Sequence, residues 1–372
     1  NTDIITTHFD YHSIDANLLK LDILGHDDPT MIRMLEDLTG LDAQTIPLDN
    51  PEVMSLFKST EALGIRPEDI GGCPLGCLGI PEFGTDFVIQ MLLDTKPQSF
   101  SDLIRISGLS HGTDVWLGNA QTLIEEGKAT ISTAICTRDD IMIYLIDKGL
   151  ESELSFTIME SVRKGKGLKP EWEKEMTDHG VPDWYIWSCK KIKYMFPKAH
   201  AAAYVMMAYR IAYYKIFYPL AYYAAYFSIR ASAFSYELMC MGKERLEYYM
   251  EDYQKRADTL TKKEQDTYKD MKNVQEMYAR GFEFVPVDLY KAQAHRFQIV
   301  DGKLMPALDT IEGLGDKAAD AVVLAARDGK FLSKDDFRQR TKVSKTVIDF
   351  MDDLGIFGDL PETNQISLFD FQ

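Results

Sequence analysis

Residues 311–322 read IEGLGDKAADAV, and this short stretch predicts how the C-terminal part of the chain folds. Gly313 and Gly315 alternate with apolar residues, and small residues follow at Ala318 and Ala321. Glycine lets the backbone turn tightly and approach another group closely, and the first amides of a helix attract anions. The pattern therefore predicts a tight hairpin that opens directly into a helix whose amide groups can face an anion.

This hairpin resembles a helix-hairpin-helix motif, which we place at residues 309–325. A loop of this kind grips a phosphate through its backbone and does not read the base sequence. Lys317 adds a positive charge at the start of the helix, so we expect Gly313, Gly315 and Lys317 to bind DNA. The alternative is a tight turn between two helices in which the glycines serve only as caps.

The rest of the chain is expected to be mainly α-helical with small β elements, an α+β class. Hydrophobic periodicity predicts helices through most of 85–230 and one long charged helix from about Leu238 to Gly281. Two short strands are expected at 296–300 and 303–305, because an Asp-Gly pair, which is typical of tight β-turns, separates them.

The first 29 residues are expected to begin as extended chain. Residues 18–24 alternate in character, so Leu19, Leu21 and Ile23 share one face of a predicted strand. Asp28 followed by Pro29 indicates the start of a helix in cap-then-proline order. We interpret Asp27 and Asp28 as turn and cap residues.

The composition indicates a folded, soluble chain. Its 372 residues allow two or three domains, and 45% hydrophobic residues can bury sizeable cores. Five scattered cysteines and no signal peptide favour a reducing compartment, with cytoplasm as the expected location. Cys73 and Cys77 lack the further ligands that structural zinc requires. The most apolar stretch, 199–227, contains Arg210 and Lys215, so we expect no membrane span.

Charge is distributed unevenly along the chain. The formal net charge is −17, which by itself argues against nucleic acid, since DNA binding requires Lys and Arg. Residues 184–236 nevertheless contain no Asp or Glu, while they carry seven cations, namely Lys190, Lys191, Lys193, Lys198, Arg210, Lys215 and Arg230. This asymmetry predicts an anion-binding segment. The alternative is a hydrophobic core segment, where carboxylates are rare in any case.

Residues 190–204, KKIKYMFPKAHAAAY, place this charge at the start of a predicted helix. Pro197 suits the first helical turn, so Lys198 and His200 lie near the positive end of the helix dipole. His200 and Tyr204 are four residues apart and share one face. We interpret the segment as a triphosphate cradle with an aromatic platform for a base or sugar. The alternative is a solvated lysine surface with a structural histidine.

Asp22 is the acidic residue in the otherwise apolar run Leu21-Asp22-Ile23. A carboxylate in an apolar strand is costly unless it is paired or bound to a metal. From the residues alone, a metal ion and the neighbouring Lys20 are both acceptable partners for Asp22.

Taken together, these segments resemble the C-terminal part of PolC-type replicative DNA polymerases, the DNA polymerase III alpha-subunit family of Gram-positive bacteria. The strings that carry the resemblance are long and unusual, and they occur at 8–13, 18–29, 79–85, 107–119, 136–141, 160–167 and 190–204.

The resemblance implies a DNA-directed DNA polymerase whose palm holds two Mg²⁺ ions on three aspartates, with Asp22 as the third of them. The metals then activate the primer 3′-hydroxyl and stabilise the leaving pyrophosphate. The other two aspartates and the exonuclease of the family are expected upstream, so we interpret the chain as a fragment that does not polymerise alone.

By the same resemblance, we expect residues 1–29 to end the palm, 30–230 to form the fingers, 231–360 the duplex-binding domain and 361–372 a tail that binds the sliding clamp. The expected ligands are primer-template DNA and an incoming dNTP, with other replisome subunits as partners. Charge and position assign the dNTP to Arg138, Lys190, Lys193, Lys198, His200 and Tyr204.

The final residues 365–372 read QISLFDFQ and follow a short polar spacer. They resemble the peptide by which bacterial polymerases dock on the clamp, in which Gln365 would bond at the pocket rim while Leu368 and Phe369 bury in it. Three further residues extend beyond the usual end of that motif. The alternative is a tail that folds back on its own domain.

A second hypothesis for the whole chain is a non-catalytic adaptor that binds DNA and docks on the clamp. The adaptor would not need the cluster at 190–204, and its DNA affinity would not respond to dNTP. A metal-dependent nuclease is less well supported, because it needs at least two clustered carboxylates and Asp22 stands alone in the sequence.

Overall fold

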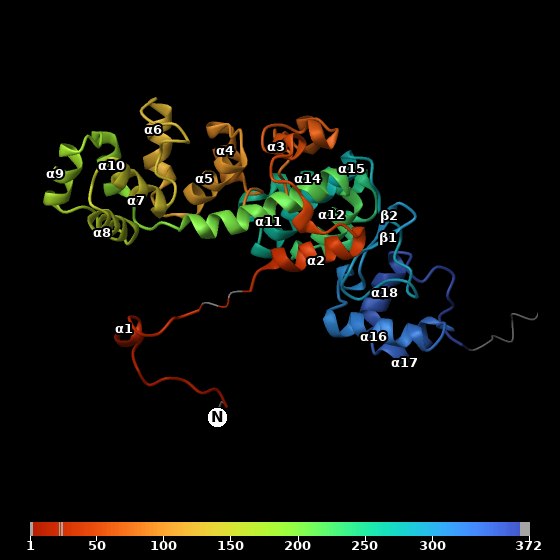
Figure 1. Cartoon of the computed structure of the whole chain (residues 1–372). Coiled ribbons are helices and arrows are strands. Elements are labelled where there is room, and N and C mark those ends of the chain that lie inside the picture. Colours follow the sequence, from red (N-terminus) through yellow and green to blue (C-terminus); the bar gives the residue numbers. More distant parts are fainter. Residues whose placement is uncertain (1–2, 22, 24, 365–372) are drawn as a thin grey trace, which may run out of the picture.

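The computed structural model describes residues 3–21, 23 and 25–364 (Figure 1). The described part of the chain is mostly helical and has one two-stranded sheet, as the sequence predicts. Its helices form an elongated body, and the last of them make a separate cluster at one end. None of the helices in these residues is both long enough and apolar enough to cross a membrane.

The N-terminal segment departs from the prediction. The described residues up to Gly25 contain one short helix, α1 (Tyr11–Ile14), and no strand. Leu19, Leu21 and Ile23 are all exposed, and Figure 1 shows the segment extending away from the body. Alternation of side chains does not make a strand without a neighbour that satisfies the backbone hydrogen bonds, and the described residues provide none here.

Residues 27–230 form the helical body. α2 begins at Asp27, two residues earlier than predicted, with His26 instead of Asp28 as its N-cap. The helices of this part are α2 (Asp27–Thr39), η1 (Ala43–Thr45), α3 (Pro51–Ser55), η2 (Glu61–Leu63), η3 (Pro67–Ile70), α4 (Asp86–Thr95), α5 (Phe100–His111), η4 (Trp116–Ala120), α6 (Gln121–Glu125), α7 (Arg138–Asp147), α8 (Ser152–Arg163), α9 (Pro170–Asp178), α10 (Asp183–Lys191), α11 (Lys198–Phe217), α12 (Pro219–Ala225) and η5 (Tyr226–Arg230).

Helix α11 is the central element of this body. Figure 1 shows it running from the lobe of α6–α10 to the helices around α12. It packs against α5, α2, α3 and α12. Tyr209 and Tyr214 are fully buried, and their hydroxyls donate to the carbonyls of Asn50 (3.1 Å) and Leu41 (2.8 Å). Buried tyrosines need such partners, so these bonds fix α11 to the segment after α2.

The long helix predicted at 238–281 is three helices instead: α13 (Tyr236–Met239), α14 (Lys243–Lys255) and α15 (Lys262–Ala279), with η6 (Ala257–Thr259) between the last two. Gly242 has φ +102°, a conformation that a helix cannot contain. Thr261 and Glu264 form a capping box that starts α15 anew. The prediction missed both local signals because the helical periodicity continues on either side of them.

The predicted β-hairpin is confirmed. Strands β1 (Gln298–Val300) and β2 (Lys303–Met305) are antiparallel, with Gln298 opposite Met305. Asp301 and Gly302 both have positive φ, +50° and +73°, as the two central residues of a type I′ turn require.

A second hydrophobic core holds the C-terminal cluster together. It packs η7 (Leu308–Thr310), α16 (Asp316–Arg327), α17 (Lys334–Thr341) and α18 (Lys345–Asp353) around buried Leu308, Phe337 and Met351. The body has its own core, centred on α11 and α12. The two regions that the sequence links to anion binding, 190–204 and 309–325, therefore lie on different cores.

Candidate nucleic-acid and nucleotide sites

The hairpin before α16 has the geometry that its sequence predicts. Ile311 and Leu314 are buried at 1% and 2% exposure and anchor the loop in the second core. Gly313 has φ +91°, and a Cβ there would lie 2.6 Å from Cγ2 of Val347. Gly315 has open space around it and an ordinary φ of −69°, so nothing within the described residues requires glycine at that position. Its small size leaves the backbone accessible to a partner.

The N-terminus of α16 is exposed and uncapped. Gly315 is its N-cap, and no side chain of the described residues accepts a hydrogen bond from the first amides. Gly315, Asp316 and Lys317 are all exposed. Free amides at a helix start are suited to an anion such as a phosphate.

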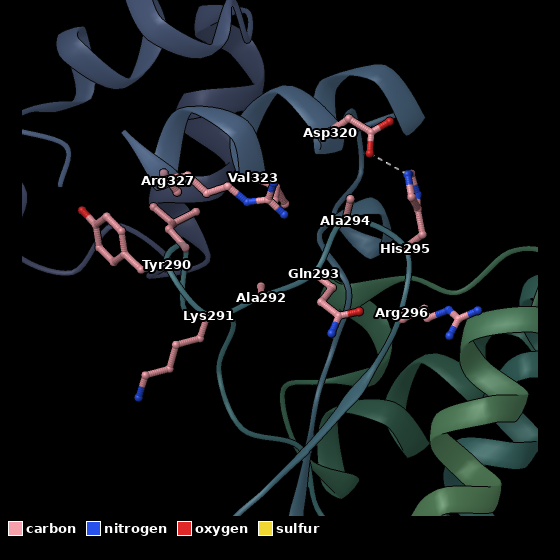
Figure 2. A pocket seen from close by; sticks show the side chains of 12 residues that line it. Tyr290, Lys291, Ala292, Gln293, Ala294, His295, Arg296, Asp320, Val323 and Arg327 are labelled. Atoms are coloured by element: carbon pink, nitrogen blue, oxygen red, sulfur yellow. Dashed lines mark hydrogen bonds and ion pairs between the residues drawn. The ribbon is translucent and has the colours of Figure 1, made fainter. Parts of the chain in front are cut away.

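Carboxylates surround this helix start and contact His295; Figure 2 shows one of these contacts, that with Asp320. His295 Nδ1 lies 3.1 Å from Asp309 Oδ2 and 3.8 Å from Asp316 Oδ1, while Nε2 lies 2.9 Å from Asp320 Oδ1. A neutral imidazole has one N–H and cannot donate to carboxylates on both sides. The hydrogen bond to Asp309 and that to Asp320 raise the pKa of His295, which favours the doubly protonated ring.

At the start of α11, the predicted aromatic platform is assembled. The His200 and Tyr204 rings lie 4.3 Å apart, with Phe196 5.1 Å from His200. His26 adds its edge to Tyr204 at 4.7 Å, a contact that the sequence did not indicate. Burial and the nearby His111 lower the pKa of His200, so this histidine is neutral at physiological pH.

Only part of the predicted cationic group comes together. Lys193 and Lys198 are exposed just before and at the start of α11, and the backbone of Arg138 lies beside this segment, since its amide donates to the carbonyl of Phe196 (3.2 Å). The amide of Lys198 donates to Asp139 Oδ2 at 2.6 Å, so an internal carboxylate already occupies part of this helix N-terminus. Lys190 instead forms an ion pair with Glu173 at 2.8 Å.

Lys215 and Arg230 do not contribute open positive charge to the segment. Lys215 is fully buried, with Nζ 2.8 Å from Glu276 Oε1 and donating to the carbonyls of Gly76 (2.8 Å) and Leu78 (2.6 Å). Arg230 pairs with Asp28 at 3.1 Å. The expectation that all seven cations of 184–236 are available to an anion is therefore wrong for these two, because carboxylates distant in sequence neutralise them.

Asp28 is a residue whose role sequence reasoning missed. It was interpreted as a cap or turn residue, yet it is fully buried, with Oδ1 3.1 Å from Arg230 and 3.4 Å from His26. Its Oδ2 is buried and has no hydrogen-bond partner in the part of the chain that the structure describes, and burial raises the pKa of this carboxyl. The sequence shows three polar residues in a row here but cannot indicate which of them faces inward.

Glu82 and His111 form a second pair that the sequence did not reveal. Glu82 Oε2 lies 2.5 Å from His111 Nε2, and His111 Nδ1 lies 2.7 Å from the carbonyl of Ser107. The hydrogen bond to Glu82 raises the pKa of His111, and a protonated ring satisfies both contacts. His26, Asp28 and Glu82 also bring one ligand atom each within 4.8 Å of one another, a spacing that a metal ion could use.

Asp22, Gln365, Leu368 and Phe369 lie outside the described residues. The expectations for the palm carboxylate and for the clamp-binding tail therefore remain predictions.

Comparison with known proteins agrees with the hairpin and with the helical body. Residues 28–181 match the bacterial DNA polymerase III alpha subunit finger domain, and residues 281–366 match a helix-hairpin-helix motif. The chain is 57% identical to the PolC-type DNA polymerase III of Caldanaerobacter subterraneus over 99% of its length, and 57% identical to that of Clostridium perfringens over 99%. Identity to the Bacillus subtilis protein is 57% over 98% of the chain.

The chain spans about a quarter of the length of these curated relatives, 26% of the first and 25% of the other two. At more than half identity over nearly all its residues, with the finger and hairpin regions matched separately, the chain belongs to the PolC-type DNA polymerase III family.

Proposed function

We propose that this chain is the fingers and duplex-binding part of a replicative DNA polymerase, which transfers a nucleotide from dNTP to the primer 3′-hydroxyl under the direction of a template. The observation that carries the proposal is 57% identity to PolC-type DNA polymerase III over nearly the whole chain. The exposed, uncapped helix start after Gly313 and Gly315 supports binding of a duplex backbone.

The proposal divides the chain into four parts, with the palm ending near residue 29, fingers at 30–230, a duplex-binding domain at 231–360 and a clamp-binding tail at 361–372. Matches of 28–181 to a finger domain and 281–366 to a helix-hairpin-helix support the two central parts. On this view Gly313, Gly315 and Lys317 hold a phosphate of the duplex and fix the position of the primer terminus relative to the fingers.

For the incoming dNTP, the proposal uses the start of α11. Lys198, Lys193 and Arg138 would neutralise the triphosphate, while the His200 and Tyr204 rings support the base or sugar. Lys190 would have to break its ion pair with Glu173 to bind the triphosphate, so we assign it a smaller contribution to dNTP binding. His200 is neutral, so one ring nitrogen can donate a hydrogen bond while the other accepts one, which suits orientation of a substrate rather than charge neutralisation.

Two Mg²⁺ ions are part of the proposal, and Asp22 is the ligand that we assign to this chain. Its carboxylate is the hard oxygen ligand that Mg²⁺ prefers. When bound, the ions supply activation of the primer hydroxyl and charge stabilisation on the phosphates. The two further aspartates would come from the remainder of the polymerase.

The test is primer-template binding by the parent polymerase with and without the complementary dNTP. We expect the correct dNTP to tighten the complex with a dideoxy-terminated primer, and Lys198→Gln to weaken this dNTP effect by about tenfold while leaving binary DNA binding unchanged. Lys174→Gln, an exposed lysine on α9, is the charge-matched control. DNA affinity that is indifferent to dNTP in the wild type would favour the adaptor instead.

We also propose that residues 365–372 dock on the sliding clamp. Gln365, Leu368 and Phe369 would supply one polar contact and two apolar anchors. Deletion of 365–372 from the polymerase should shorten products made in the presence of clamp and leave short extension without clamp unchanged. Clamp-dependent synthesis that survives the deletion would refute this role.

A further inference from the structure

A hollow of about 530 Å³ lies between the loop 289–296 and one face of α16 (Figure 2). The loop turns at 289–291 and bends at 294–295, with Lys291 and His295 exposed while Ala292 and Ala294 are buried. The carbonyls of Gln293 and Ala294 accept hydrogen bonds from the amides of 308 and 309, both at 3.0 Å. These bonds hold the loop in place beside the hairpin.

Three cations line the hollow: Lys291, Arg296 and Arg327. Figure 2 shows Arg327 extending from α16, while Lys291 and Arg296 project from the loop. Among the residues that the structure describes, no carboxylate pairs with any of the three. Elsewhere in the C-terminal cluster, Lys334 binds both Asp352 and Glu362, and Arg340 binds Asp336.

The hollow is thus lined by three cations that have no carboxylate partner within residues 3–21, 23 and 25–364, in a chain whose net charge is −17. A group of cations that lines one hollow attracts anions through its summed potential, so the arrangement indicates an anionic partner. Asp320, which also lines the hollow, is already bound to His295 at 2.9 Å. The charge that the hollow presents to a partner is therefore positive.

We propose that this hollow binds the sugar-phosphate backbone of duplex DNA, next to the phosphate that the hairpin holds; the inference rests on the proposed DNA-binding function. Arg327 lies ten residues after Lys317 on α16, or about 15 Å along the helix axis. That length corresponds to the rise of about four base pairs, so hairpin and hollow can hold separate phosphates of one duplex.

Duplex DNA fits the hollow better than single-stranded DNA. Proteins that bind single strands stack bases on free aromatic rings. Tyr290, an aromatic residue in the lining, packs its ring 5.8 Å from that of Phe331, and its hydroxyl accepts a hydrogen bond from the Phe331 amide at 3.1 Å. The hollow therefore offers cations for phosphates without an aromatic ring that is free to stack on a base.

The test compares two triple variants of the 372-residue chain by fluorescence anisotropy with a labelled duplex at several salt concentrations. The first variant carries Lys291→Gln, Arg296→Gln and Arg327→Gln. The control carries Lys174→Gln, Lys255→Gln and Lys262→Gln, which removes the same charge at exposed lysines of α9, α14 and α15. Circular dichroism confirms that both variants fold.

Each phosphate contact contributes about 0.9 to the slope of log K against log salt, so loss of three contacts should reduce that slope by about 2.7. The control should keep the wild-type slope. An unchanged slope in the first variant, an equal loss in the control, or a loss for a single strand alone would overturn the inference. If Lys317→Gln weakens duplex binding and the first triple variant does not, the result supports DNA binding by the hairpin and refutes DNA binding by the hollow. No duplex binding by the wild-type chain overturns both.

Discussion

The starts of α11 and α16 are the two helix N-termini that the sequence links to anions, and their surroundings are opposite. α11 begins among lysines, yet the carboxylate of Asp139 already accepts from the Lys198 amide. α16 begins among carboxylates, yet its first amides have no side-chain cap in the described residues.

The pKa values of the two histidines near these helix starts are shifted in opposite directions. Burial lowers the pKa of His200, whereas the hydrogen bonds to Asp309 and Asp320 raise that of His295. At α11 the lysines supply the positive charge and the histidine can stay neutral. At α16 the histidine must carry charge, because it offsets acidic side chains that would repel a phosphate. Attraction of an anion to the helix N-terminus therefore depends on side chains at α11 and on the backbone at α16.

The largest expected effect is a loss of stability in the region around α11 that leaves the C-terminal cluster unchanged. Lys215→Met leaves Glu276 buried without its cation, and breaking a fully buried pair costs about 3–5 kcal/mol. Because the C-terminal cluster has its own core, hydrogen exchange should show faster opening around α11 and unchanged protection in α16–α18.

The matched control replaces both partners. Glu276 also accepts a hydrogen bond from the Tyr223 hydroxyl at 2.6 Å, and glutamine can keep that contact. Lys215→Met combined with Glu276→Gln should therefore recover most of the lost free energy of unfolding. Equal loss of protection in α16–α18 would mean that the two regions unfold together.

A smaller effect tests the backbone at α16. Gly313→Ala places a Cβ 2.6 Å from Val347 at φ +91°, and we expect a loss of about 1–3 kcal/mol in the free energy of unfolding of the C-terminal cluster, measured by denaturant titration.

Gly315→Ala is the control: we expect it to lower duplex affinity while leaving stability nearly unchanged. Its φ is −69° and its surroundings are open, so stability should change by less than about 0.5 kcal/mol. The added methyl group would nevertheless obstruct a phosphate that approaches the backbone, and duplex affinity should fall. Full affinity in the Gly315 variant would contradict the close approach that we assign to the hairpin.

What could be predicted from the sequence is mostly local. The β-turn at Asp301-Gly302, the hairpin at Gly313 and the contact of His200 with Tyr204 each depend on residues a few positions apart. Spacing alone fixes such neighbours, because turn conformation and the helical repeat determine them.

What could not be predicted depends on pairing between distant segments. Arg230 lies 202 residues from Asp28, and no local pattern identifies either as the other's partner. Lys215 likewise contributes to the local positive charge in the sequence but meets Glu276 in the fold. The prediction of an N-terminal strand was wrong for a related reason. The alternation of side chains is a local pattern, whereas a strand requires a neighbouring strand to pair with.

The smallest expected effect concerns the protonation of His295. Its pKa is raised above 6.5 by Asp309 and Asp320, with Asp316 also facing the ring, so the favourable charge is present at low pH and is lost as pH rises through the raised pKa. Duplex affinity of the wild-type chain should fall over that range by roughly up to fivefold, the size of an exposed charge interaction. His295→Gln should bind more weakly at low pH and show a flat profile. His200→Gln should keep the wild-type profile above pH 6.5, because the lowered pKa leaves His200 neutral there. A flat wild-type profile would show that the hairpin does not depend on this charge, and that the two helix starts differ less than their geometry indicates.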